Sequence, residues 1–467
     1  MVFRAQMRLF GSINNEFVVS YTTKADATPV PQSADMTDND RQFLIELAQA
    51  AIDSARIEPG ASALDPEGKP TGRPNTLDFA IIPPGGRAHY PALWVEEIPY
   101  SFATGLVPVE EGLNHLRLIA ACQNGPEWRA LDGAAALWPY AVPDHVNFDG
   151  TAVFFPGTYS PDDDQGGEPY GVRPPASNHY DFIWLAWLLV RHTGSPELLR
   201  EEFSDVPLLD RLRRAFDAVP AETDTGLVAT TAEERFVGFL FCDAIYMTGR
   251  LLTASLLRHR AAGNLADLYA LVGREDHAEA MRAVARQIEQ NVPTAFTPRP
   301  GRGWLPASTG VSNQDDVWGT IYALWRRVLV GPPAQKAYRQ ILRALDDGTI
   351  LYEGAVRHVP LDGDASATSA WEHTEVPYNR YMNGAYWHVP TGWLIDLLSR
   401  EDPDRAGAVL DAYVAHMREH DFRRGPELGG PWECIGPEKE AWKCPVFLGS
   451  ITMPLGVLAA EWWRESA

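Results

Sequence analysis

The chain has 467 residues, of which 45% are hydrophobic, and its formal net charge is −22. Such an acidic chain lacks the basic footprint that nucleic acids and anionic membranes require, so we expect neither as a partner. The beginning of the chain has no apolar run typical of a signal peptide, and no stretch approaches about 18 uninterrupted apolar residues. We therefore expect a soluble, cytoplasmic protein.

The first segment alternates weakly and then becomes polar and rich in proline. Residues 1–37 are therefore predicted to form a short arm, or β-strand pair, that ends in a linker. Helical periodicity begins beside Thr37 and Asp38, either of which can cap the first helix. With this first helix the pattern predicts about 12 helices. The others are predicted at 108–122, 178–193, 196–217, 232–262, 264–272, 275–291, 314–330, 332–346, 383–399, 402–419 and 445–464.

Loops rich in glycine, proline and aromatic residues separate alternate helices. The long ones are predicted at 123–177, 292–313, 347–382 and 420–444, and the other connections are short. Because strands and helices do not alternate, neither a doubly wound sheet nor a TIM barrel is expected. Helices joined alternately by short and long loops predict an all-α toroid of helical hairpins. Long loops are usually functional, and we expect them to wall a cavity at one end of the toroid.

The cysteines and the catalytic motifs exclude several classes of site. Of the four cysteines, Cys434 and Cys444 could bridge one loop, but buried free thiols are the expected state. There is no C-x-x-C pair, H-E-x-x-H motif, G-x-S-x-G motif, P-loop or dinucleotide fingerprint. The sequence therefore predicts neither a metal site nor a cofactor.

Residues 371–393 read WEHTEVPYNRYMNGAYWHVPTGW. Tryptophan and tyrosine offer flat apolar faces with one polar edge, and amides and carboxylates beside them bond in the plane. A pyranose ring needs both an apolar face to stack on it and partners for its hydroxyl groups. The stretch, in a chain with 15 tryptophans, therefore predicts a carbohydrate ligand.

Similar clusters of carboxylates and aromatic rings recur along the chain. They supply the residues predicted to bind the sugar, which are Trp94, Glu96, Glu97, Asp144, His145, Asp315, Asp316, Trp318, Glu372, His373, Asn383, Tyr386, Trp387 and Trp432. For Asp315 and Asp316 the alternative is that one of them caps a helix.

Two further carboxylates suit acid and base catalysis. Asp243 interrupts the otherwise apolar run GFLFCDAIYMTG, so it is expected to be partly buried, which favours the protonated form that a general acid needs. Glu433 lies in the rigid loop GGPWECIGP, where it could orient a water molecule as a general base. Hydrolysis of a glycoside with inversion needs this pair, with the carboxyl groups about 6.5–9.5 Å apart. A structural Asp243 and a solvated Glu433 are the alternatives.

Four segments together resemble the six-hairpin glycosidases, the (α/α)6-toroid superfamily that includes trehalases and glucosidase I-like hydrolases. QDDVWGTIYALW resembles their Asp-Asp-Trp helix start, NGAYWHVPTGW their Asn-Gly-x-Tyr/Trp-Trp segment, GFLFCDAIYMTG their acid segment and WECIGP their base loop. The resemblance implies an (α/α)6 catalytic domain at 38–467, with Asp243 as general acid, Glu433 as general base and inversion of the anomeric centre. We therefore expect an inverting glycoside hydrolase that is exo-acting on a short or terminal sugar.

Three alternatives stay open from the sequence. A sugar epimerase or isomerase on the same toroid would need a base such as the pair His373 and His388. A lyase or an unsaturated-uronide hydrolase is a second alternative, and a non-catalytic carbohydrate-binding protein is the third. Epimerisation leaves the mass of the sugar unchanged, whereas hydrolysis adds water. The oligomeric state is not predicted.

Overall fold

The computed structural model describes residues 36–65, 68–87, 89–162, 164–363, 371–436 and 441–458. The chain divides into two units, Met1–Gln32 and Ser33–Ala467, and all that follows concerns the second. Residues 1–35 lie outside the described residues, so the predicted arm or strand pair at 1–37 stays a prediction.

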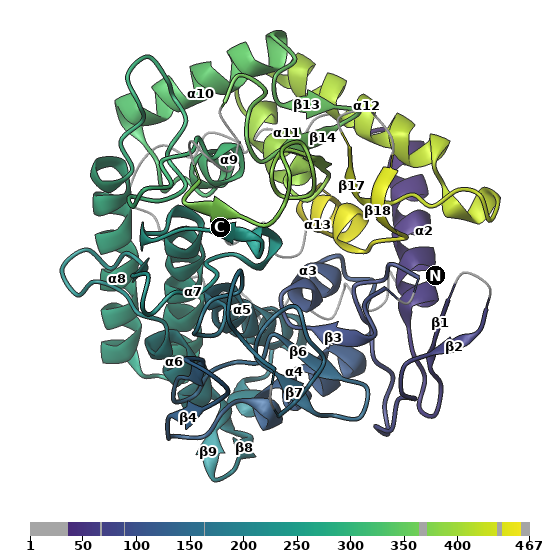
Figure 1. The fold of residues 1–467 in the computed structure, drawn as a ribbon, viewed down its shortest axis with the longest axis vertical. Coiled ribbons are helices and arrows are strands. Elements are labelled where there is room, and N and C mark those ends of the chain that lie inside the picture. Colours follow the sequence, from purple (N-terminus) through teal and green to yellow (C-terminus); the bar gives the residue numbers. More distant parts are fainter. Residues whose placement is uncertain are drawn as a thin grey trace. The chain divides into compact units, whose positions relative to one another are not determined.

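Twelve α-helices occur in the described part of the chain, and they follow one another around a ring (Figure 1). Their bounds are α2 Asp38–Ala55, α3 Glu97–Ala103, α4 Val109–Cys122, α5 Ala176–Thr193, α6 Leu208–Ala218, α7 Leu252–Leu271, α8 Glu275–Ala295, α9 Val317–Trp325, α10 Gly331–Asp346, α11 Thr391–Ser399, α12 Pro403–Glu419 and α13 Gly449–Leu458.

The odd-numbered helices form a closed inner ring. Helix α3 packs on α5, α5 on α7, α7 on α9, α9 on α11, α11 on α13, and α13 returns to α3. Each even-numbered helix packs outside, for example α8 on α7 and α12 on α11. The fold is therefore an (α/α)6 toroid, as the sequence predicted.

Sequence pattern explains which helices lie inside. Every residue of α5 from Ala176 to Val190 is buried. Most are apolar, and polar ones such as Asp181 and Asn178 bond to the buried groups Arg260 and Asp144. Helix α8 buries only the stripe formed by Ala278, Met281, Ile288 and Val292. A helix with a single apolar stripe is stable on the outside of a domain, whereas one without a polar face must be enclosed.

Short antiparallel strands occupy the loops between helices. The largest sheet has the order β13-β14-β16-β17-β18, with β13 Leu351–Tyr352, β14 Ala355–Arg357, β16 Tyr386–Trp387, β17 Trp432–Ile435 and β18 Ala441–Pro445. A three-stranded sheet joins β3 Ala92–Trp94, β6 His145–Asn147 and β7 Ala152–Val153. The remaining strands form two-stranded pairs: β1 Ala63–Leu64 with β2 Pro70–Thr71, β4 Arg129–Ala130 with β5 Ala136–Leu137, β8 Glu202–Phe203 with β9 Val206–Pro207, β10 Ala229–Thr230 with β12 Gly249–Arg250, and β11 Ile245–Tyr246 with β15 His373–Thr374.

The predicted helix at 232–262 is wrong over its first half. Residues 232–251 form a loop with a 3-10 turn at Leu240–Cys242, and α7 begins only at Leu252. The amide of Leu240 donates to the Glu96 carboxylate and to Ser177 rather than to a helical carbonyl. An apolar run buried by tertiary contacts has the same composition as a buried helix, so periodicity alone did not separate the two.

Three smaller differences concern helix boundaries. The predicted helix at 383–399 begins at Thr391, because the preceding residues form β16. The one predicted at 196–217 is divided into a 3-10 helix, Pro196–Arg200, the β8–β9 hairpin and α6. Helix α3 was not predicted, although its proline lies in the first turn, where proline is tolerated.

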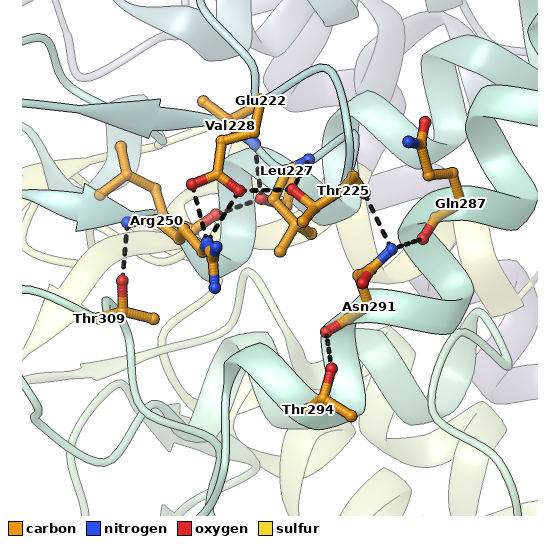
Figure 2. Close-up of polar contacts among 11 residues, drawn as sticks. Glu222, Thr225, Leu227, Val228, Arg250, Gln287, Asn291, Thr294 and Thr309 are labelled. Atoms are coloured by element: carbon orange, nitrogen blue, oxygen red, sulfur yellow. Dashed lines mark hydrogen bonds and ion pairs between the residues drawn. The ribbon is translucent and has the colours of Figure 1, made fainter.

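A polar network holds the segment before α7 in place (Figure 2). Both carboxylate oxygens of Glu222 accept from Nε of Arg250 at 2.9 Å, and Thr225 Oγ1 donates to Glu222 at 2.6 Å. The amide of Arg250 donates to Thr309 Oγ1 at 2.9 Å, and Asn291 of α8 donates to the Thr225 carbonyl at 3.5 Å. The network therefore anchors β12, the last strand of the loop that carries Asp243.

All four cysteines are free thiols; Cys242, Cys434 and Cys444 are buried, as expected, whereas Cys122 is partly exposed. Cys434 and Cys444 lie on the neighbouring strands β17 and β18, out of register by one residue. Within the described residues, no helix is long and apolar enough to span a membrane.

Candidate active site

A cavity of about 220 Å³ lies among loops that precede inner-ring helices. Its walls carry four carboxylates, several aromatic rings and few aliphatic side chains. The lining residues are Tyr90, Trp94, Glu96, Glu97, Pro156, Gly157, Thr158, Tyr159, Tyr170, Leu240, Phe241, Asp243, Tyr381 and Glu433.

The toroid explains why these distant residues meet. Trp94 ends β3 just before α3, Asp243 precedes α7, Tyr381 precedes α11, and Glu433 in β17 precedes α13. Each of these helices belongs to the inner ring, so its preceding loop lies at the same end of the ring. The prediction that long loops wall a cavity at one end is borne out by these lining residues.

Glu433 is held in a defined orientation. It is 2% exposed, and its Oε1 accepts a 2.6 Å hydrogen bond from the Tyr90 hydroxyl. Burial, followed by the charge of Glu433, raises the pKa of Tyr90 well above its ordinary value, so Tyr90 keeps the proton that it donates. The main chain of β17 is fixed by Ser450 of α13, whose hydroxyl donates to the Trp432 carbonyl at 2.6 Å.

Asp243 is partly buried, as the sequence predicted, at the end of the turn Leu240–Cys242. Tyr381 lines the same cavity. Burial, and then the charges of Asp243 and Glu433, raise the pKa of Tyr381 well above its ordinary value. Tyr381 therefore stays protonated beside both carboxylates and can donate a hydrogen bond.

Glu96 and Glu97, at the start of α3, both line the cavity. Oε2 of Glu96 accepts from Ser177 Oγ at 2.9 Å and from the Leu240 amide at 3.1 Å. Burial, and then the charges of Asp181 and Glu97, raise the pKa of Glu96 well above its ordinary value. Burial likewise raises the pKa of Glu97. Both carboxyls therefore favour the protonated form, which can donate to a sugar hydroxyl.

Asp144 and His145 form a buried pair whose imidazole packs on the indole of Trp94. The two buried side chains share a 2.7 Å contact between Asp144 Oδ2 and His145 Nδ1, and the imidazole stacks on Trp94 with 4.3 Å between ring centroids. Neither is among the residues that line the cavity. They fix the orientation of the Trp94 ring.

Asp315, Asp316 and Trp318, the predicted residues at the start of α9, make contacts within the protein. Asp315 accepts from Arg299 and Arg302, and Asp316 caps α9 by accepting from the Gly319 amide at 2.7 Å. The helix-cap alternative thus holds for Asp316. Buried Trp318 donates from its indole nitrogen to the Val356 carbonyl at 3.2 Å.

The predicted residues of the 371–393 stretch also lie outside the cavity lining. Glu372 accepts from the Thr248 amide and hydroxyl, and Asn383 is buried, bonding Trp371 and the Val376 carbonyl. His373 is exposed and pairs with Glu375, whereas Tyr386, Trp387 and Trp432 lie in the five-stranded sheet. Direct sugar contacts by these residues and by those around α9 stay predictions.

Four tyrosines of the lining were not predicted from the sequence: Tyr90, Tyr159, Tyr170 and Tyr381. Tyr381 lies within the aromatic stretch at 371–393, so its neighbours were a usable signal. Tyr90, Tyr159 and Tyr170 lie in loops rich in glycine and proline, where no periodicity marks an inward side chain.

Two solved structures with bound sugars are similar to this chain. A rhamnosidase from Klebsiella oxytoca with rhamnose bound is 12% identical, covers 92% of this chain and matches with a TM-score of 0.52. The GH63 mannosylglycerate hydrolase from Thermus thermophilus, in complex with glucose, is 14% identical and covers 89% of this chain, with a TM-score of 0.50. The chain has their fold. The fold that the resemblance implied, an (α/α)6 toroid, is thus confirmed.

The chain spans 65% of the rhamnosidase chain but 99% of the mannosylglycerate hydrolase chain. An uncharacterized conserved protein from Thermus thermophilus is 13% identical, with a TM-score of 0.53, and also matches over 99% of its length. No family model and no curated protein matches the sequence.

Proposed function

We propose that the protein is an inverting glycoside hydrolase that removes a single or terminal sugar. The observation that carries the proposal is the presence of Asp243 and Glu433 in the wall of one cavity, beside the indole of Trp94. Two carboxylates of different surroundings and one stacking ring are what hydrolysis of a glycoside requires.

In the proposed mechanism the two carboxyl groups act on opposite sides of the anomeric carbon. Asp243, partly buried, gives its proton to the departing glycosidic oxygen as the bond to the sugar breaks. Glu433 takes a proton from a water molecule, whose oxygen forms the new bond to the anomeric carbon with inversion. The Tyr90 hydroxyl, which donates to Oε1 of Glu433, orients this carboxylate.

Exo action is supported by the size of the cavity. Its 220 Å³ is below the range of about 300–1,000 Å³ found for drug-sized ligands, so it suits one sugar unit rather than a chain. Stacking on Trp94 and hydrogen bonds from Glu96, Glu97 and Tyr381 would hold that unit. The bound ligands of the two similar structures, rhamnose and glucose, are also single sugars.

The epimerase alternative is disfavoured by the positions of its two histidines. His373 is exposed in β15, whereas His388 is buried, and its Nε2 contacts the Glu353 carbonyl at 3.1 Å. Neither is among the residues lining the cavity. A non-catalytic sugar-binding protein would not need Asp243 and Glu433 on the same cavity.

The first experiment is a screen of purified protein on α-linked disaccharides and aryl glycosides, followed by the variants Asp243→Asn and Glu433→Gln. Each variant should lower kcat at least about 100-fold, the usual contribution of one general acid or base. The exposed residues Asp411 and Glu427 provide matched controls, Asp411→Asn and Glu427→Gln, which should retain activity. Full turnover by both cavity variants would disprove the catalytic assignment.

Stereochemistry tests the mechanism separately. Proton NMR of the first product formed should show the anomer opposite to that of the substrate. A crystal structure should place the carboxyl groups of Asp243 and Glu433 about 6.5–9.5 Å apart, and a separation of about 5–5.5 Å would indicate retention instead.

A further inference from the structure

A second group of chemically reactive side chains is formed by Glu353, His416 and His420. Glu353 occupies the tip of the β13–β14 hairpin, His416 lies in the last turn of α12, and His420 follows directly as its C-terminal cap. None of the three lines the cavity described above. One potential ligand atom from each residue lies within 4.8 Å of those of the other two.

The three side chains already face one another. Oε2 of Glu353 is 2.6 Å from Nδ1 of His416, and the rings of His416 and His420 have centroids 4.5 Å apart. Tetrahedral zinc with ligands at about 2.0–2.1 Å requires ligand atoms about 3.3 Å from one another. Small rotations of the side chains therefore suffice to bring all three onto one ion.

The hairpin packs on α12 and is bonded to residues at and just before the start of α11. The Thr391 hydroxyl donates to the Gly354 carbonyl at 2.6 Å, and His388 Nε2 contacts the Glu353 carbonyl at 3.1 Å. A Cβ on Gly354 would lie 2.6 Å from the Cα of Tyr413, so the hairpin tip lies directly on the helix. Glu353 has a φ of 48° and Gly354 one of 75°, the positive values that a two-residue type I′ hairpin turn requires.

One nitrogen of His416 is unused by the contact with Glu353. His416 is 3% exposed, and among the described residues its Nε2 is buried without a hydrogen-bond partner.

We propose that Glu353, His416 and His420 bind a divalent transition metal ion, with Zn²⁺ as the best fit. Two imidazoles and one carboxylate form a ligand set known for zinc, whereas Ca²⁺ and Mg²⁺ prefer oxygen ligands alone. His416 and His420 have the spacing H-x-x-x-H, one turn of helix, but this spacing alone does not indicate a metal site, because the third ligand comes from a distant hairpin.

The proposed metal site lies between the β13–β14 hairpin and helix α12. Strand β13 is the edge of the five-stranded sheet in which β17 carries Glu433, and α12 is an outer helix of the toroid. An ion bound between hairpin and helix would fix this edge of the sheet. The role is structural and independent of the proposed hydrolase activity.

Thermal unfolding of tag-free protein, stripped with a chelator, tests the proposal. Zn²⁺ at 100 times its Kd should raise Tm by about 2–3 °C, and Mg²⁺ at the same concentration should not. Glu353→Gln and His420→Ala each remove one ligand and should weaken zinc binding at least about 100-fold in calorimetric titration. His420 is only partly buried, so its replacement should leave the fold intact.

His259 offers a matched control. Its Nε2 lies 2.8 Å from Oε1 of Glu289, so it forms a histidine–glutamate pair outside the proposed site. His259→Ala should bind zinc like the parent protein. With Co²⁺ in place of Zn²⁺, the parent protein should show the strong visible absorption of a four-coordinate ion. No zinc-dependent rise in Tm, or unchanged zinc affinity in His420→Ala, would overturn the proposal.

Discussion

The hydroxyl of Tyr90 donates a 2.6 Å hydrogen bond to the carboxylate of Glu433. Tyr90 lies before the first inner helix, α3, and Glu433 before the last, α13, and these two helices pack together where the ring closes. The contact therefore links ring closure to the orientation of the proposed general base.

Removing this hydroxyl should impair catalysis more than substrate binding. Tyr90→Phe keeps the ring and its 5.1 Å edge contact with Trp94 but loses a hydrogen bond to a charged group. Such a bond contributes about 1.5–3 kcal/mol, so kcat should fall about 10–100-fold. Steady-state kinetics should show little change in KM.

Tyr338 of the outer helix α10 provides the control. Tyr338 is not among the residues that line the cavity, so Tyr338→Phe should leave kcat unchanged. If Tyr90→Phe raised KM and kept kcat, Tyr90 would contact the substrate rather than orient Glu433.

Trp94 is expected to hold the sugar by stacking. Trp94→Ala removes the ring that rests on His145 and should raise KM about 10-fold, given the roughly 0.5–1.5 kcal/mol of an aromatic stack plus the lost apolar area. Initial rates across a range of substrate concentrations measure the effect. Trp128, which is 58% exposed, gives the control Trp128→Ala, and equal KM changes in both variants would refute a role in binding.

The buried ion pair of Asp181 in α5 and Arg260 in α7 should make a large contribution to the free energy of unfolding. The two side chains form an ion pair at 0% and 5% exposure, and Arg260 also lies 4.3 Å from the centre of the Trp184 ring. Burial raises the pKa of Asp181 to about 6, against the lowering effect of Arg260. Arg260→Met should cost about 3–5 kcal/mol in the free energy of unfolding, because a buried carboxylate loses its partner.

Denaturant unfolding of three variants separates charge from packing. Adding Asp181→Asn to Arg260→Met removes the uncompensated charge and should restore part of the lost stability. If the double variant were no more stable than Arg260→Met, the loss would come from packing against Trp184.

His179 should make the fold sensitive to acid. Burial lowers its pKa from 6.5 to about 4, and it accepts a hydrogen bond at Nε2 from the Val142 amide. Between these two values the unfolded chain binds the proton and the folded chain does not. The contribution of His179 to stability is therefore present above pH 6.5 and is lost as the pH falls towards 4, by up to about 3 kcal/mol.

The test compares the parent protein with His179→Gln between pH 7.5 and pH 4.5. Glu96 and Glu97, whose pKa values are raised, have the opposite effect on the pH dependence. Their contribution to the stability of the fold decreases as the pH rises above 4.5. The difference in unfolding free energy between parent and variant isolates His179. It should shrink on acidification, and a difference that stayed constant with pH would contradict the prediction.

Asp243 and the 371–393 stretch show what composition indicates about a site and what it does not. The apolar run around Asp243 predicts that its carboxyl group is partly buried. In the structure Asp243 lines the same cavity as Glu433. The 371–393 stretch looked more suited to sugar binding, yet Trp387 and Asn383 are both buried in structural contacts. Composition indicates what a side chain can contact, but its direction depends on the backbone around it.

Sequence by itself determined the toroid, because helical periodicity and the alternation of short and long loops are local properties of the chain. The structure then shows which helices lie inside, such as α5, whose residues from Ala176 to Val190 are all buried. Only the tertiary structure decided which loop residues meet. Tyr90 meets Glu433 through ring closure, and Glu353 meets His416 because the β13–β14 hairpin packs on α12; both contacts join segments that are far apart in the chain.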